Sequence, residues 1–114
     1  MTFKGKVRFY PKGTLILKPD VPGAQMWSVT LQKTMLTYFE INPNSRFEAH
    51  SHASEQITMV LEGELFFTVN ERILCLQSGE VLAIPSRVPH AAFTKHRPAK
   101  AVDAWSPVMK KYKS

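Results

Sequence analysis

Hydrophobic and polar residues alternate along most of this chain with a period of two, which is typical of β-strands that bury one face. No segment offers three turns of amphipathic helix without a glycine, a proline or a competing strand pattern. The residues Val108–Lys113 are expected to form at most a short turn. Strand-length segments of this kind, rich in β-branched and aromatic residues, are Met26–Leu31, Leu36–Ile41, Ile57–Leu61, Leu65–Val69, Ile73–Leu76, Val81–Ile84, Ala91–Phe93 and Ala101–Trp105.

Turn-forming residues separate these segments at intervals suited to hairpins. Gly63 falls between two of the predicted strands, and Asn70-Glu71 predicts a tight turn before the next. We expect Val7–Tyr10 and Leu15–Leu17 to form the first strands. The pattern as a whole predicts an all-β sandwich or barrel.

The chain has 114 residues, of which 44% are hydrophobic and 21% charged, so we expect one globular domain spanning residues 1–114. No apolar run approaches the ~18 residues of a membrane-spanning helix, and none of signal-peptide length follows the N-terminus. We therefore expect a cytoplasmic protein without a membrane partner. Cys75 is the only cysteine, which excludes an internal disulfide, and its apolar surroundings predict a buried, inert thiol.

The formal net charge of +6 raises the question of nucleic-acid binding. Much of the excess lies near the ends of the chain, in Lys4, Lys6 and Arg8 and in the segment 110–113. No nucleic-acid recognition motif and no interleaving of basic and aromatic residues accompanies it, so no nucleic-acid partner is expected. A basic surface also attracts small anions, which suits a small-molecule ligand.

Three of the four histidines have a spacing that suggests a metal site. His50 and His52 form an H-x-H pair, and on an extended segment their side chains point the same way. His90 follows downstream, after Gly79 and Pro85. Three imidazoles suit Mn, Fe, Ni, Cu or Zn, so one divalent transition metal ion is the expected cofactor. His96 lies in a polar segment and is not expected to be a ligand.

The spacing around these histidines resembles the two motifs of the cupin family. The first motif runs glycine, five residues, H-x-H, three or four residues, an acidic ligand, six residues, glycine; the matching segment is 44–63. The second runs glycine, five residues, P-x-G, two residues, histidine, and the matching segment is 79–94. The resemblance implies a jelly-roll barrel. The departures from the motifs are Asn44, Gln56, Arg87 and Thr94.

In the cupin family the residues at the first-motif and second-motif ligand positions bind a divalent metal inside the barrel. Carried over by position, this resemblance implies that the ligands are His50, His52, Gln56 and His90. Glu55 competes with Gln56 for the fourth position, but adjacent strand residues face opposite ways, and the spacing favours Gln56. Because Gln56 is uncharged, the metal would keep more positive charge for an anionic ligand.

Two further segments resemble the cupins that convert unsaturated monouronates to open-chain keto acids. One is the segment 50–63, which contains the pair Glu55-Gln56, and the other is Asp103-Ala104-Trp105-Ser106-Pro107. The resemblance implies that Asp103 is a catalytic general acid or base and that Trp105 stacks on the substrate ring. The two residues would share one strand face. Met109 stands where that group has an arginine.

Three functions remain open from the sequence. The first is a metal-dependent enzyme acting on a small sugar acid such as an unsaturated uronate. The others are another metal-cupin activity, such as a small-molecule dioxygenase, and a non-catalytic ligand-binding or sensor protein. A homodimer is also expected, because Phe3, Val7, Phe9 and Tyr10 form a strand candidate that could pair with a second subunit.

Overall fold

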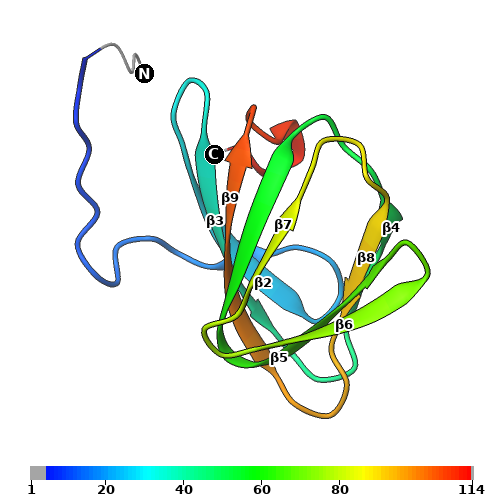
Figure 1. Cartoon of the computed structure of the whole chain (residues 1–114). Coiled ribbons are helices and arrows are strands. Elements are labelled where there is room, and N and C mark those ends of the chain that lie inside the picture. The colour runs from blue at the N-terminus through cyan, green and yellow to red at the C-terminus, as the bar shows by residue number, and fades with distance from the viewer. Residues whose placement is uncertain (1–4, 114) are drawn as a thin grey trace.

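A computed structural model describes residues 5–113 as a barrel of curled antiparallel strands (Figure 1). The hydrogen-bonded order is β1-β2-β3-β9-β5-β8-β4, and β6 and β7 also pair with β5. The elements are β1 (Lys18–Pro19), β2 (Ala24–Thr30), β3 (Met35–Ile41), β4 (Arg46–His50), β5 (Glu55–Val69), β6 (Arg72–Gln77), β7 (Val81–Ile84), β8 (His90–Phe93), β9 (Ala99–Ser106) and the 3-10 helix η1 (Lys110–Tyr112).

The long strand β5 joins the two walls of the barrel. Its first half pairs with β7 and β9, and its second half pairs with β6 and β8. A bulge between Val60 and Glu62 lets the strand bend without ending. Gly63 has a φ of 77°, and a Cβ there would collide with the carbonyl oxygen of Pro98. The prediction of two strands separated at Gly63 is therefore wrong. This glycine lets the backbone of β5 pass close to Pro98 while the strand continues.

The other predicted strands from Met26 onwards are confirmed with bounds that differ by two residues or fewer. The prediction of strands at Val7–Tyr10 and Leu15–Leu17 is wrong, because these residues have no strand partner in the described chain and the first strand is the two-residue β1. Phe3 lies outside the described residues. Asn70 and Glu71 both have positive φ and form the predicted tight turn.

The hydrophobic core lies inside the barrel and is built from the inward side of each strand. Val60, Phe39 and Phe67 are nearly or fully inaccessible to solvent. Tyr112 of η1 packs its ring against Phe39 at one end of this core, with ring centroids 5.5 Å apart. The short turn expected near the end of the chain thus contributes a core residue. Within the described residues, no helix has both the length and the apolar character needed to cross a membrane.

Cys75 is exposed, so the prediction of a buried thiol is wrong. In β6 it lies opposite Phe66, whereas the neighbouring Leu76 lies opposite Leu65 and is buried. Alternation in a strand allows only one of two adjacent side chains to face the core. An apolar run without polar residues does not reveal which one it is.

Candidate metal centre

Three histidine rings converge at one end of the barrel interior. His50 ends β4, His52 follows it in the connection to β5, and His90 begins β8. The pairing of β4 with β8 places His50 opposite His90, with ring centroids 4.5 Å apart. One ring nitrogen from each histidine lies within 4.8 Å of the others. Two nitrogens bound to one ion at ~2.1 Å are at most ~4.2 Å apart, so small side-chain rotations are sufficient for shared coordination.

The backbone fixes which nitrogen of each ring is available. The Nδ1 atom of each histidine lies within hydrogen-bond distance of a backbone carbonyl oxygen, which can only accept, so Nδ1 carries the proton of a neutral ring. Each Nε2 therefore has a lone pair, and such backbone contacts are how proteins orient metal-binding imidazoles. The accepting oxygens belong to Glu48, Ser54 and Val88, at 2.7, 2.8 and 2.9 Å from His50, His52 and His90.

His90 has a ring nitrogen without a partner among the described residues. Its Nε2 is buried and forms no hydrogen bond within the described chain. Burial lowers the pKa of His90, and the neighbouring His50 and His52 lower it further, so the ring stays neutral. A buried neutral imidazole with an unsatisfied acceptor is the form that binds a transition metal.

Gln56 lies beside the triad with its amide oxygen 3.1 Å from Nε2 of His52. Its amide nitrogen donates to the Thr58 hydroxyl at 2.9 Å, which fixes the orientation of the amide. The amide oxygen and the His52 nitrogen are then two acceptors in contact, an arrangement that a cation relieves. Glu55 is exposed and faces away from the interior. The structure therefore places Gln56, and not Glu55, where it would complete a four-ligand set.

Asp103 lies in the same interior, on the central strand β9 between β3 and β5. Its register partners are Thr37 and Thr58, and both hydroxyls donate to its carboxylate, Thr37 at 3.0 Å. The Gln56 amide nitrogen is 3.5 Å away. Burial raises the pKa of Asp103 to about 6, although the three donors oppose this shift. A carboxyl group with this pKa can both accept and release a proton near neutral pH.

Trp105 lies on the same side of β9 as Asp103, as the sequence predicts, and is buried. Its Nε1 donates to the Thr37 hydroxyl at 2.9 Å. The ring meets that of His52 at 5.3 Å between centroids and that of Tyr112 at 5.6 Å. The Trp105 ring thus lies between the rings of His52 and Tyr112.

A mainly apolar cavity joins these groups. Its empty volume is about 440 Å³, including the part open to solvent. None of the residues that line it is lysine or arginine. Met109 does not line it and packs against the core, its backbone N–H 3.3 Å from the sulfur of Met35. The lining residues are Phe39, Ile41, Phe47, His50, Gln56, Leu65, Phe67, His90, Ala92, Ala101, Asp103, Trp105 and Tyr112.

Sequence reasoning missed Thr37, Thr58 and Tyr112. The two threonines reach Asp103 only through the register of three strands, which no local pattern reveals. Tyr112 lies in a short basic segment that the pattern marks only as a possible turn. His96 is exposed and lies outside the triad, as predicted.

Several solved structures are similar to this one at low sequence identity. KdgF from Halomonas sp. has a TM-score of 0.85 at 18% identity, covering 93% of this chain and all of that chain. An RmlC-like cupin from Shewanella frigidimarina has a TM-score of 0.87 at 19% identity, covering 95% and 97%. The polyketide cyclase RemF from Streptomyces resistomycificus has a TM-score of 0.79 at 19% identity, covering 90% and 81%. No curated protein matched the sequence significantly.

The family model of the cupin domain matches residues 37–105, which is more than half of the chain. The matched range contains the histidine triad, Gln56, Asp103 and Trp105. The two segments that resemble the cupin motifs lie within it and fold as strands and turns of one barrel. Asn44 and Arg87 depart from glycine in those motifs and both adopt positive φ, 55° and 67°. This chain belongs to the cupin domain family.

Proposed function

We propose that this protein is a metal-dependent enzyme that opens the ring of a small unsaturated uronate to give the open-chain keto acid. The observation that carries the proposal is the placement of Asp103, His50 and His90 in the lining of one cavity. Gln56, which also lines it, contacts both His52 and Asp103. A proton-transfer group and a metal-binding group within reach of one small molecule are the minimum that this isomerisation needs.

The metal would be held by His50, His52, His90 and Gln56, all neutral ligands. When bound, such an ion acts as a Lewis acid that polarises substrate oxygens and attracts a carboxylate. Because the cavity has no lysine or arginine in its lining, an anionic substrate depends on this positive charge. This ligand set suits Mn, Fe, Ni, Cu and Zn.

Asp103 would move the proton that the reaction relocates. In the ring form of the sugar, the C1 hydroxyl loses its proton to the carboxylate as the bond from C1 to the ring oxygen breaks. The C1 carbonyl forms, and the ring oxygen becomes an enolate oxygen on C5. Asp103 then returns the proton to C4, so that C5 becomes a ketone and no atom is gained or lost. A pKa of about 6 suits both transfers.

Thr37 and Thr58 keep the carboxylate in one orientation during these transfers, since each hydroxyl donates to a different oxygen of Asp103. Trp105 offers its ring as an apolar wall for the sugar. The likeness of Asp103-Ala104-Trp105-Ser106-Pro107 to uronate-linearising cupins supports this substrate class. The similarity of the fold to that of KdgF is consistent with it.

The test measures turnover of a 4,5-unsaturated galacturonate monomer by the loss of its enol-ether absorbance. Protein purified without a metal-affinity step is first analysed for its metal content and then assayed with metal and after chelation. We expect the metal-loaded protein to exceed the spontaneous rate, and the chelated protein to fall back to it. Asp103→Asn should keep the metal and lower kcat by about 10²–10⁴-fold, the usual contribution of a general acid or base.

Glu71→Gln is the control, because this exposed carboxylate lies in the turn between β5 and β6, outside the metal cavity. The control should turn over as the wild type does. A wild-type rate equal to the spontaneous one would refute the proposal. Saturable binding of the uronate without turnover would identify a ligand-binding protein instead.

A further inference from the structure

The turn between β7 and β8, residues 85–88, is bound to two of the three histidines. The Arg87 N–H donates to the carbonyl oxygen of His52 at 2.8 Å. The next carbonyl oxygen, that of Val88, lies 2.9 Å from Nδ1 of His90. The turn therefore connects the segments that carry His52 and His90, and it lies at the same end of the barrel as the histidine triad.

Arg87 occupies a backbone position that favours glycine. The Val88 N–H donates to the Pro85 carbonyl oxygen at 3.4 Å, so Arg87 is the third residue of a β-turn, and its φ is 67°. A β-turn with positive φ at this position usually has glycine or asparagine there, because a Cβ atom makes the left-handed conformation unfavourable. Backbone strain of this kind beside a candidate site indicates that the side chain has a role there.

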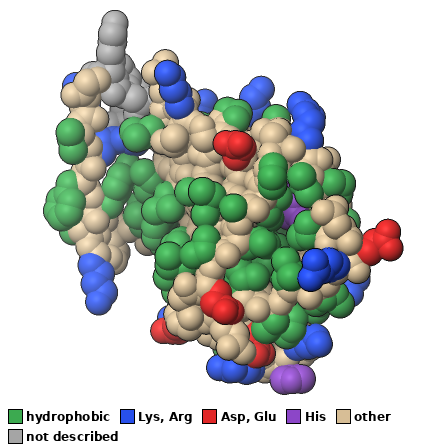
Figure 2. All heavy atoms as spheres, viewed as in Figure 1, with side chains coloured by type: hydrophobic (Ala, Val, Ile, Leu, Met, Phe, Trp, Pro, Cys, Tyr) green, Lys and Arg blue, Asp and Glu red, His purple; other side chains and the backbone are tan. Residues whose placement is uncertain are grey.

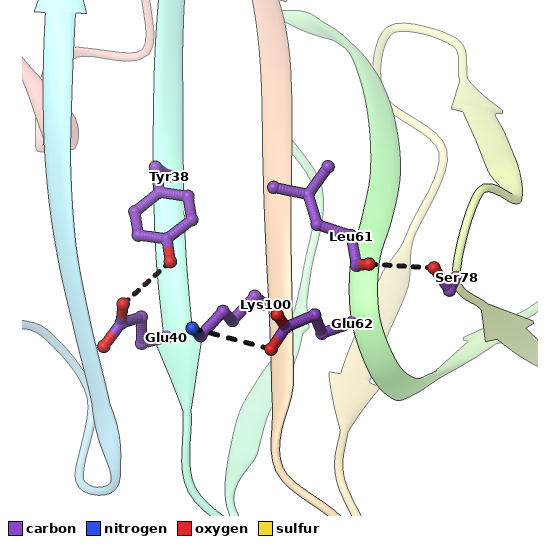
Figure 3. Close-up of polar contacts among 6 residues, drawn as sticks. All are labelled: Tyr38, Glu40, Leu61, Glu62, Ser78 and Lys100. Atoms are coloured by element: carbon purple, nitrogen blue, oxygen red, sulfur yellow. Dashed lines mark hydrogen bonds and ion pairs between the residues drawn. The ribbon is translucent and has the colours of Figure 1, made fainter. Parts of the chain in front are cut away.

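The Arg87 side chain is exposed, and its guanidinium has no ion pair or hydrogen bond within residues 5–113. Two other basic side chains near the opposite end of the barrel are paired with carboxylates. Arg97 lies 3.7 Å from Glu64. Lys100 lies 3.5 Å from Glu62, as Figure 3 shows. The Arg87 guanidinium is therefore available to bind an anion from solution.

The charges of the site leave a place for this cation at its entrance. His50 is the exposed member of the triad, so the site opens to solvent at this end of the barrel. The lining of the cavity contains the carboxyl group of Asp103 and no lysine or arginine. On the face seen in Figure 2, Lys and Arg side chains are distributed and do not form one continuous basic patch. An entering carboxylate is repelled by Asp103 when that group is ionised, and a guanidinium at the entrance offsets the repulsion.

We propose that Arg87 is a substrate-binding residue that holds the carboxylate of the sugar acid at the entrance of the metal centre. The planar guanidinium offers two parallel N–H donors to the two oxygens of a carboxylate. The ligands that this site selects are therefore sugar acids with a free carboxylate, in preference to their esters. This inference rests on the proposed function and adds to it the residue that recognises the acid group.

The variant Arg87→Gly separates recognition from structure. Glycine adopts positive φ without a steric cost, so the variant should keep the turn, the metal content and the Tm of the wild type. Its KM for the unsaturated uronate should rise at least about tenfold, equivalent to ~1.4 kcal/mol, with kcat nearly unchanged, because the carboxylate contact is present before and during the reaction. Arg87→Lys keeps the charge without the planar donors and should recover part of the loss.

A binding experiment tests the same contact without turnover. Titration calorimetry on metal-loaded protein measures the affinity for saturated galacturonate and for its methyl ester, which differ in the charge of one group. We expect the wild type to bind the acid more tightly than the ester. This preference should fall at least about tenfold in Arg87→Gly. Arg97→Gly is the matched control, because it removes the same charge from the loop between β8 and β9, at the other end of the barrel, and should keep the preference.

The outcomes distinguish this inference from the proposed function. A preference for the acid that depends on Arg87, in a wild type that does not exceed the spontaneous rate, would refute the proposed function and support the inference. Normal turnover with an unchanged KM in Arg87→Gly would overturn the inference alone. It is also overturned if the wild type does not prefer the acid, if Arg97→Gly loses the preference equally, or if Arg87→Gly loses its metal.

Discussion

At one level of the barrel, the inward and outward side chains of three neighbouring strands differ in a direction opposite to that of most soluble proteins. Thr37, Asp103 and Thr58 point into the barrel from β3, β9 and β5, and all are buried. Their sequence neighbours Leu36, Ala104 and Ile57 point outwards and are exposed. At this level the polar groups thus lie inside and the apolar ones outside, while the rest of the interior is mainly apolar. Buried polar groups gathered at one level of an otherwise apolar interior are typical of a functional site.

The inner face can be polar because its groups satisfy one another. Trp105 donates to Thr37, Thr37 and Thr58 donate to Asp103, and Gln56 donates to Thr58. A buried polar network of this kind is tolerated only when its members are paired. The apolar side chains of the outer face cannot satisfy one another in this way. They lose their contact with water only when another surface covers them.

The largest expected effect is on the inner face, at the metal. His52→Ala should weaken binding of a divalent transition metal by about 100-fold or more, because it removes one of the nitrogens that we propose as metal ligands. Titration calorimetry on chelated protein measures this. His96→Ala, an exposed histidine outside the triad, should bind as the wild type does. Equal affinity of His52→Ala and the wild type would place the metal elsewhere.

Metal removal should next lower the stability of the fold. At a free metal concentration of 100 times Kd, binding to the native state adds about 2.7 kcal/mol to the free energy of unfolding. We expect chelation to lower Tm in the wild type and to leave Tm of His52→Ala unchanged. Thermal melts followed by circular dichroism compare the wild type and His52→Ala, each with metal and after chelation. An equal fall of Tm in both proteins would show that chelation acts away from the triad.

A smaller effect is expected when the support of Asp103 is removed. Thr37→Val leaves the Trp105 N–H without its acceptor and one oxygen of Asp103 without its donor. Such an unpaired buried group costs about 1–3 kcal/mol of unfolding free energy. Denaturant unfolding measures the cost. Thr37→Ser keeps the hydroxyl and should recover most of the loss, whereas a serine variant as unstable as the valine variant would show that only packing matters.

The smallest effect is expected from the residue next to Asp103. Ala104→Ser lies on the outer face, so it should leave metal affinity and turnover unchanged and alter the unfolding free energy by no more than about 0.5 kcal/mol. Turnover and metal binding are measured as for Asp103→Asn, and the unfolding free energy is measured by denaturant unfolding. A large loss of metal binding in Ala104→Ser would contradict the division between the two faces.

Much of the site could be predicted from the sequence because its spacing is local. The shared face of Asp103 and Trp105 follows from the alternation of side chains in a strand. The H-x-H pair and the choice of Gln56 over Glu55 follow from the spacing of the first cupin motif. The structure brings His50, Gln56, Asp103 and Trp105 to the lining of one cavity and places His52 beside His50 and His90. The roles assigned to them remain predictions. The prediction for Cys75 failed because an apolar run does not show which of its residues faces inwards.

The sequence by itself determined the period of two, the cupin motifs and the candidate ligands, because these depend on residues a few positions apart. Only the tertiary structure decided that Thr37 and Thr58 hold Asp103, that β5 continues through Gly63, and that Leu36, Ala104 and Ile57 face outwards. Strand register and the covering of a face depend on residues distant in sequence. The segments Val7–Tyr10 and Leu15–Leu17 show the same limit, since their composition suits strands but they have no strand partner in the described chain.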